Sequence, residues 1–189
     1  RWCGTMIKIG VSARHVHLCQ KDLDTLFGEG YEFTKYKDTY NPGYVSEEKV
    51  DVWLGFEESF ECRILLPATE VSQVELSQSD CKRFGIEAPL NRSFDLTNAG
   101  RCQISTYHGE ISGNFAIRTK RHLHLTPTDA DELDLYDGQY CTVEAGTVVF
   151  KEVLVRVKDW YKTSLHLDTD EGNAARVKED TMAKVVRND

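Results

Sequence analysis

The residues best suited to metal chemistry in this chain are four of its six histidines, which form two His-x-His pairs. His15 and His17 stand in "ARHVHL", and His122 and His124 stand in "KRHLHL". In a β-strand, side chains two positions apart point to the same face, about 6.6 Å apart, so each pair can converge on one ion. Imidazole nitrogen binds zinc, copper, nickel or iron, and zinc is the commonest of these in proteins.

The two pairs belong to a longer repeat. An arginine precedes each pair and a leucine follows it, and an aspartate lies five residues after each second histidine. The offset is 107 positions both from His15 to His122 and from Asp22 to Asp129. This constant offset predicts a duplicated structural unit. A single His-x-His pair is more often an ordinary strand feature, but two pairs inside a duplication favour metal binding.

The remaining histidines and one cysteine are weaker candidates. His166 lies in "SLHLDTDEGNAA" and by itself would be interpreted as a satisfied core histidine, whereas His108 in "STYHGE" is expected to face solvent. Cys19 continues the alternation of the first pair and could offer a soft ligand. A structural role is favoured, since Cys19 matches the helix N-cap position that Thr126 has in the repeat.

The elements that must position these side chains are mostly short strands, such as "MIKIGVSA", "SQVELSQ" and "TVVFKEVLVRVKD". They are rich in Val, Ile, Thr and aromatic residues and are bounded by turn signals. Short helices follow each pair, and in "TPTDADELDL" Thr126 is a suitable N-cap with Pro127 at the first helical position. We predict a mainly β protein of two similar small β-barrel domains with a few short α-helices, over 1–100 and 101–189, with exchange of strands between the halves left open.

The composition of the chain limits the kinds of partner that we expect. A chain of 189 residues with a net charge of −8 lacks the basic surface that drives nucleic-acid binding. The six cysteines form no C-x-x-C, and no apolar run of 18 residues or secretory signal is visible. We therefore expect free thiols in a cytoplasmic protein, with neither nucleic acid nor a membrane as partner.

Five stretches carry a resemblance to a known family. "VSARHVHL", "QVELS", "RHLHLTPTDA", "VRV" and "LHLDTDEGNAA", in this order and spacing, resemble the phosphate propanoyltransferases, phosphotransacylases of bacterial microcompartments. The resemblance runs from about residue 6 to residue 178. It implies two β-barrels with a dinuclear zinc site between them, and acyl transfer between coenzyme A and inorganic phosphate.

The resemblance also implies which residues form the site. One of the two Zn²⁺ ions is expected on His15, His17 and Glu75, and the other on His122, His124 and His166. The expected catalytic anion contacts are Arg14 and Arg156, and the expected substrate-binding residues are Ser12, Ser93 and Asn173. Phosphate would attack a short-chain acyl-CoA such as propionyl-CoA directly, because two metal ions can hold both phosphate and thiolate without an acyl-enzyme.

The chain departs from the family pattern at three positions. Thr69 stands where the family has a phosphate-binding arginine, Tyr44 replaces a glutamine after Pro-Gly, and Phe94 replaces the glycine of Ser-Gly-Asp. Threonine cannot reproduce the charged fork of an arginine. Two alternatives therefore stay open: a zinc-stabilised binding or assembly module without catalysis, and a hydrolase in which metal-bound water is the nucleophile.

The resemblance extends to partners and location. Acyl-CoA, coenzyme A and phosphate are the expected small-molecule partners. Further expectations are self-association into a homo-oligomer, a location inside a bacterial microcompartment, contact with its shell or cargo enzymes, and a role in propanediol degradation. They rest on the family alone.

Overall fold

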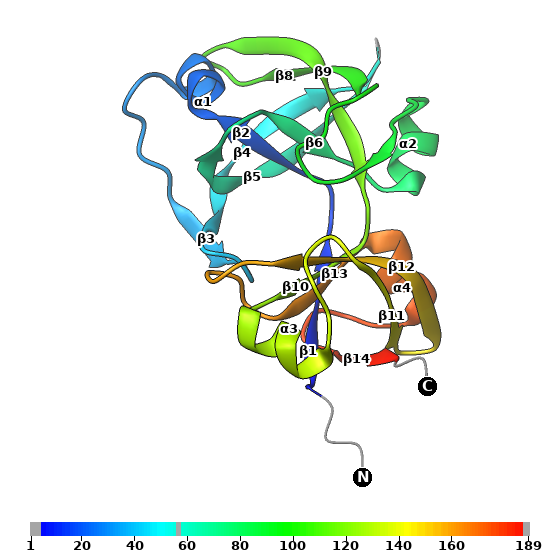
Figure 1. Ribbon diagram of the computed structural model, residues 1–189. Coiled ribbons are helices and arrows are strands. Elements are labelled where there is room, and N and C mark those ends of the chain that lie inside the picture. The colour runs from blue at the N-terminus through cyan, green and yellow to red at the C-terminus, as the bar shows by residue number, and fades with distance from the viewer. Residues whose placement is uncertain (1–4, 56–57, 187–189) are drawn as a thin grey trace. The chain divides into compact units, whose positions relative to one another are not determined.

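The computed structural model describes residues 5–55 and 58–186, and these form a mainly β protein (Figure 1). The described residues contain fourteen strands and four short helices. Contacts divide the chain into two compact units, of which the first has a closed barrel. The predicted fold class is confirmed.

Unit 1 comprises Arg1–Ala13, Tyr40–Pro42 and Lys120–Asp189. Its strands pair in the order β1-β13-β10-β12-β11-β14 and close into a barrel. The strands are β1 (Ile7–Ser12), β10 (His122–Leu125), β11 (Tyr140–Ala145), β12 (Val148–Val157), β13 (Ser164–Asp168) and β14 (Met182–Val186). The helices are α3 (Pro127–Leu133) and α4 (Thr169–Ala175).

Unit 2 comprises Arg14–Thr39 and Gly43–Thr119. Its strands are β2 (His15–Cys19), β3 (Lys35–Asp38), β4 (Tyr44–Trp53), β5 (Ser59–Thr69), β6 (Gln73–Glu75), β7 (Leu90–Asn91), β8 (Gly100–Ser105) and β9 (Glu110–Thr119). Its helices are α1 (Gln20–Phe27) and α2 (Gln78–Phe84). Six of the strands pair in the ring β9-β6-β2-β5-β4-β8, with β8 returning to β9.

The two rings have the same strand order and the same pattern of parallel and antiparallel pairs. In the first ring β1 pairs in parallel with β13, and β10 pairs in parallel with β12. In the second ring β9 pairs in parallel with β6, and β2 pairs in parallel with β5. The other four pairs of each ring are antiparallel. The repeat found in the sequence is therefore a repeat of the whole strand ring.

Neither unit is a continuous half of the chain. Strand β1 directly precedes β2 in sequence, yet it pairs with β13 and β14 of unit 1. Strand β9 directly precedes β10, yet it pairs with β6 and β8 of unit 2. Each His-x-His strand thus follows a strand that belongs to the other unit.

Alternation of buried apolar residues with histidines sets the orientation of the two histidine strands. Val16 and Leu18 in β2, and Leu123 and Leu125 in β10, are fully buried in the apolar core of their own unit. Burying each such side chain stabilises the fold by about 1.5–3 kcal/mol. Since neighbouring residues of a strand point to opposite faces, this anchoring directs the histidines away from the apolar core.

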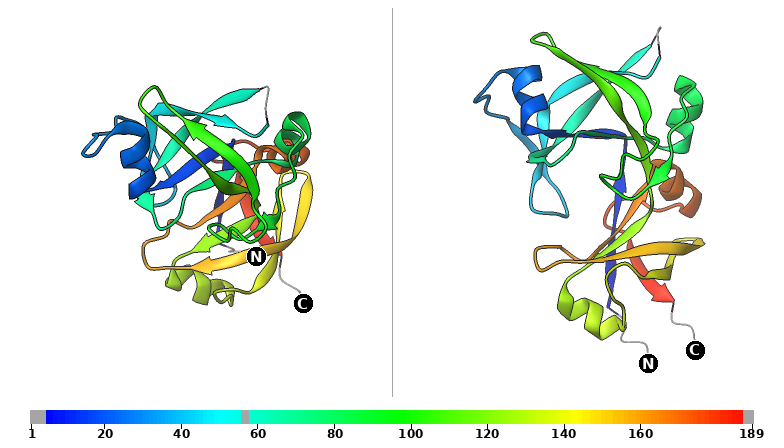
Figure 2. Two further views of the ribbon diagram at one scale, coloured as in Figure 1. Left: turned by 90° about the horizontal axis from the view of Figure 1, so that it is seen from above. Right: turned by 45° about the horizontal axis from the view of Figure 1, so that its top comes forward.

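The helices begin where capping residues stop the strands. Thr126 caps α3 by accepting from the Asp129 amide, and Pro127 takes the first helical position, as predicted. Cys19 is the N-cap of α1 without a side-chain bond, which agrees with the poor capping ability of a thiol. Figure 2 shows that α1 and α2 lie on opposite sides of unit 2, and that α3 and α4 do so in unit 1.

Two expectations from composition can be compared with the described residues. The five cysteines among them are all free thiols, and Cys3 lies outside that part of the chain. None of the described helices combines the length and the apolar character needed to cross a membrane.

Candidate metal centres

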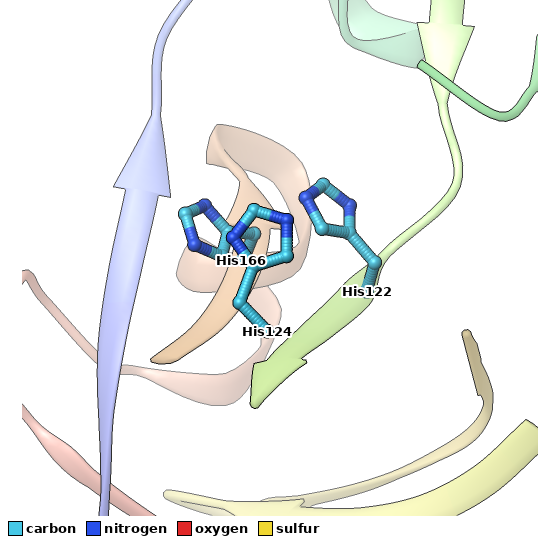
Figure 3. Close-up of side chains that lie close together, drawn as sticks. All are labelled: His122, His124 and His166. Atoms are coloured by element: carbon cyan, nitrogen blue, oxygen red, sulfur yellow. The ribbon is translucent and has the colours of Figure 1, made fainter. Parts of the chain in front are cut away.

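Three histidines of unit 1 converge on one point (Figure 3). His122 and His124 lie on β10, and the antiparallel register places His166 of β13 directly opposite His122. One ring nitrogen from each lies within 4.8 Å of the others. The predicted set His122, His124 and His166 is therefore assembled in space by two adjacent strands.

His124 is the most deeply placed member of this cluster. Its side chain is buried, and neither Nδ1 nor Nε2 has a hydrogen-bond partner among the described residues. Burial lowers the pKa of His124 far below its usual value, and His166, His122 and Arg156 lower it further. A neutral imidazole with unsatisfied buried nitrogens is costly without a ligand. The nitrogen of His124 that carries no proton fits a bound cation such as Zn²⁺.

Unit 2 holds a second cluster with the same design. His15 and His17 lie on β2, and Glu75 of β6 is directly opposite His15. The Glu75 carboxylate lies 3.3 Å from His15 Nε2 through Oε2 and 3.5 Å from His17 Nε2 through Oε1. The two histidine Nε2 atoms are 3.2 Å apart. Two imidazoles and a carboxylate at these distances fit the ligand set of a zinc ion.

The electrostatics of the second cluster suit a cation. Burial lowers the pKa of His17, although hydrogen bonding to Glu75 opposes this change. Burial by itself would raise the pKa of Glu75, but His15 and His17 together hold it well below its usual value. The cluster therefore offers an ionised carboxylate beside imidazole nitrogens.

The arginine before each histidine pair is held by an acidic side chain. Arg14 Nη1 lies 3.0 Å from Asp80 Oδ1, and Arg121 Nη1 lies 3.0 Å from Glu171 Oε1. Asp80 and Glu171 are both the third residue of the helix that follows the third-ligand strand, and both belong to a capping box. Each arginine thus ties the start of a His-x-His strand to the helix that follows its neighbour. We did not predict Arg121 and Glu171, although the repeat of "RH-x-H" marked the arginine.

The repeated aspartates have a structural explanation. The Ser72 hydroxyl donates to Asp22 and accepts from the Cys19 amide at 3.0 Å. In unit 1, the Thr163 hydroxyl likewise donates to Asp129 and accepts from the Thr126 amide at 3.5 Å. These bonds fix the turn between each histidine strand and its helix.

An aromatic ring covers the second histidine of each pair. The Phe94 ring meets His17 edge-on with centroids 5.2 Å apart, and the Tyr161 ring stacks on His124 with centroids 3.8 Å apart. Phe94 has a φ of 69°, a left-handed conformation that glycine adopts readily and phenylalanine rarely. A glycine, which the resemblance leads us to expect at this position, would adopt this backbone without strain. Tyr161 carries no pattern in the sequence that would have identified it.

The other predicted site residues are distributed over both units. In unit 1, Arg156 on β12 is next to His124 in register, while Ser12 on β1 is paired with Asp168. Asn173 lies on α4 with an exposed side chain. In unit 2, the half-buried Ser93 directly precedes Phe94. Their roles in binding substrate stay predictions.

Two of the departures from the family also lie in unit 2. Thr69 ends β5, where it pairs with Cys19, and its hydroxyl donates to the Val71 carbonyl at 2.9 Å. Tyr44 begins β4 and pairs with Leu66. Both positions are built into the strand ring that carries His15, His17 and Glu75.

Buried cysteines do not offer a nucleophile. Burial raises the pKa of the Cys62 and Cys102 thiols to about 12. The thiolate is the reactive form of cysteine, so these thiols are inert near neutral pH.

Known proteins are similar in sequence to this chain over nearly its full length. A family model described as phosphate propanoyltransferase matches residues 8–178. The chain belongs to this family. A phosphate propanoyltransferase of Clostridioides difficile is 38% identical over an alignment of 189 positions, which covers 96% of this chain and 89% of the relative.

Two further members of the phosphate propanoyltransferase family show similar agreement. The protein of Thermotoga maritima is 37% identical, covering 95% of this chain and 89% of the relative. The protein of Lachnoclostridium phytofermentans is 36% identical, covering 92% of this chain and 84% of the relative. The resemblance noted from the motifs is confirmed, as is the assignment of the chain as an acyltransferase.

Proposed function

We propose that this protein transfers a short acyl group from coenzyme A to inorganic phosphate, with one zinc ion held by each of the two clusters. The observation that carries this proposal is the presence of two ligand triads in the same strand register, each with one buried and two half-buried members, on a chain of the phosphate propanoyltransferase family. Propionyl-CoA is the substrate suggested by the names of the relatives.

The reaction is a direct displacement. A phosphate oxygen forms a bond to the thioester carbonyl carbon, the carbon–sulfur bond breaks, and the electron pair leaves with the coenzyme A sulfur. Bound zinc would supply positive charge to phosphate oxygens and to the leaving thiolate. An acidic protein could thereby bind two polyanions without a basic surface.

The residues of the chain prepare each centre for this chemistry. The imidazole of His124 is kept neutral by burial, and Glu75 is kept ionised by His15 and His17, so both present lone pairs to a cation. Tyr161 and Phe94 cover one side of the second histidine in each cluster and shield it from water. Arg156 lies next to His124 in register, and we assign it as an anion contact.

Arg14 has a more constrained role in this scheme. Its Nη1 atom is engaged by Asp80, and its guanidinium lies 5.1 Å from the centroid of the Phe60 ring. We therefore assign the substrate contact first to Arg156, while Arg14 holds the first histidine strand.

The threonine at position 69 favours one alternative to acyl transfer. Without the arginine of the family at this position, the clusters could hold metal in a protein that no longer transfers acyl groups. Contact with microcompartment shell or cargo enzymes and formation of homo-oligomers are also part of the proposal, and they rest on family membership alone.

The test is product formation by the zinc-loaded protein. Propionyl-CoA is incubated with and without phosphate, acyl phosphate is trapped with hydroxylamine, and the released thiol is titrated. Equal amounts of both products, formed only when phosphate is present, are expected. His124→Ala should abolish them, and the matched control His108→Ala, which alters an exposed histidine, should not.

Two results would overturn the proposal. Thiol release that is independent of phosphate would identify hydrolysis instead. Absence of product from protein with full zinc occupancy would identify a non-catalytic module.

A further inference from the structure

We infer that Gln73 and Ser164 are equivalent positioning residues, each of which selects the atom that the third ligand of its cluster presents to the metal. The inference rests on the proposed metal centres. The two side chains are buried and polar, and neither is among the predicted site residues.

The two residues have the same place in the repeated fold. Gln73 lies opposite His17, and Ser164 lies opposite His124, in the antiparallel pairs that form the two clusters. Each precedes the third ligand by two positions on the same strand, so it shares a face with that ligand. Both side chains are 0% exposed. A buried polar group in both copies of the repeat needs a hydrogen-bonding reason.

Ser164 determines the tautomer of His166. Its hydroxyl donates to the Lys162 carbonyl oxygen at 2.8 Å, and the same oxygen lies 2.8 Å from His166 Nε2. A hydroxyl has one proton, and a carbonyl has none to give, so the proton between Ser164 and His166 belongs to Nε2. His166 Nδ1 then keeps its lone pair for a metal ion.

A backbone carbonyl acts on His122 in the same way. His122 Nδ1 lies 2.9 Å from the Lys120 carbonyl oxygen, which can only accept. The proton is therefore on Nδ1 and the lone pair is on Nε2. In the centre of Figure 3, the nitrogen that offers its lone pair to a metal is therefore defined for His122 and His166. For His124, both ring nitrogens lack a hydrogen-bond partner among the described residues, so either can offer the lone pair.

Gln73 fixes the carboxylate of Glu75. Its side-chain amide nitrogen donates to Glu75 Oε1 at 2.7 Å. Its amide oxygen accepts from the Phe94 backbone N–H, which can only donate, so the orientation of the amide is determined. The left-handed backbone at Phe94 is thereby linked to a metal ligand through one buried side chain.

The two residue types match the two ligand types. A carboxylate ligand is held by a donor, and Gln73 supplies an amide N–H. An imidazole ligand that must expose Nδ1 is held by an acceptor at Nε2, and Ser164 acts as that acceptor because its own hydroxyl proton is donated to the Lys162 carbonyl oxygen. This difference in chemistry, at equivalent positions, is what distinguishes positioning from simple filling of space.

Loss of such a partner typically weakens metal affinity by about 10–100-fold. We expect Ser164→Ala to weaken zinc binding by about this factor at one site, and Gln73→Leu to do so at the other. Ser164→Thr keeps the hydroxyl and should restore affinity close to that of the wild type.

Matched controls separate this effect from loss of a buried or bonded polar group. Ser46 is also 0% exposed, and its hydroxyl donates to the Glu48 carbonyl at 2.8 Å without touching a ligand, so Ser46→Ala is the control for Ser164→Ala. Gln103 donates to Glu110 at 2.8 Å on the exposed surface, so Gln103→Leu is the control for Gln73→Leu.

Two readouts are needed. Zinc dissociation constants are measured by competition with a chelator, and the protonated nitrogen of His166 is identified in the metal-free protein by nitrogen NMR of labelled histidine. We expect Nε2–H in the wild type and in Ser164→Thr, and loss of this preference in Ser164→Ala.

The outcomes distinguish this inference from the proposed function. If the wild type binds zinc and Ser164→Ala matches Ser46→Ala in affinity and tautomer, the positioning role is wrong and the metal centres stand. A wild-type His166 protonated on Nδ1 would also overturn it. A wild type that binds no zinc would overturn the metal centres as well.

Discussion

Glu171→Gln tests whether burial or attraction to Arg121 dominates the pKa of Glu171, the acidic partner of the arginine that precedes the second histidine pair. Burial raises the pKa of Glu171 to about 7, Asp168 adds to this, and Arg121 at 3.0 Å opposes it. The folded chain therefore binds this proton more tightly than the unfolded chain, in which a glutamate has a pKa near 4.5. The resulting stabilisation is complete below about pH 4.5 and is lost as the pH rises through about 7.

The magnitude follows from the interval between the two pKa values. Each pKa unit corresponds to about 1.4 kcal/mol, so the free energy of unfolding should fall by at most about 3–4 kcal/mol from this group. The side chain is only 22% exposed, so screening by solvent reduces this value moderately. Glutamine cannot ionise, and Glu171→Gln should therefore become more stable relative to the wild type as the pH rises.

The measurement is urea unfolding of both metal-free proteins at pH 5 and pH 8. The matched control is Glu61→Gln, which removes an exposed glutamate paired with Lys49 at 3.1 Å and should change stability by less than about 1 kcal/mol. If Glu171→Gln instead loses stability relative to the wild type as the pH rises, attraction to Arg121 outweighs burial. Burial would then not be the main influence on the pKa of Glu171.

Three further predictions concern the metal and phosphate sites. Thr69→Arg should tighten phosphate binding, measured by calorimetry, by about tenfold, which is the gain from one charge-assisted hydrogen bond. An unaltered affinity would show that the chain at residue 69 follows a different path from that of the family. His124→Ala should lower the zinc content from two ions per chain to one by metal analysis, and retention of both would contradict the assignment of the cluster. Burial lowers the pKa values of His17 and His124 in the folded chain, so these groups should make the metal-free protein less stable as the pH drops below about 6.5. Urea unfolding is measured in the metal-free Glu171→Gln protein, which lacks the opposing effect of Glu171, and a rise in its stability would contradict buried neutral imidazoles.

Local sequence patterns predicted the parts of the site that depend on neighbouring residues. Alternation predicted that His15 and His17 share one face of a strand, and the structure shows buried Val16 and Leu18 on the other. Thr126 and Pro127 predicted the start of α3, which begins at Pro127. These features depend on a few consecutive residues, so sequence suffices.

The third ligands could not be derived from local pattern. Glu75 and His166 reach their clusters only through antiparallel pairing with strands far away in sequence, and a strand carries no label for its partner or register. Family resemblance supplied both residues. The pairing of β1 with β13, and of β9 with β6, is equally non-local.

Residues that support the ligands were missed for a related reason. The ion pair of Arg121 with Glu171 and the bond from Gln73 to Glu75 depend on side-chain geometry at the ends of strands and helices. The left-handed backbone of Phe94 was also hidden, because a phenylalanine gives no signal for positive φ.

Titration of metal-free protein with zinc, while acyl phosphate formation from propionyl-CoA and phosphate is followed, tests the central claim most directly. Activity should be absent without metal, rise with added zinc and reach its maximum at two ions per chain, with one thiol released for each acyl phosphate formed. Full activity in protein shown to be free of metal, or no acyl phosphate at two bound ions per chain, would contradict zinc-dependent transfer at these two clusters.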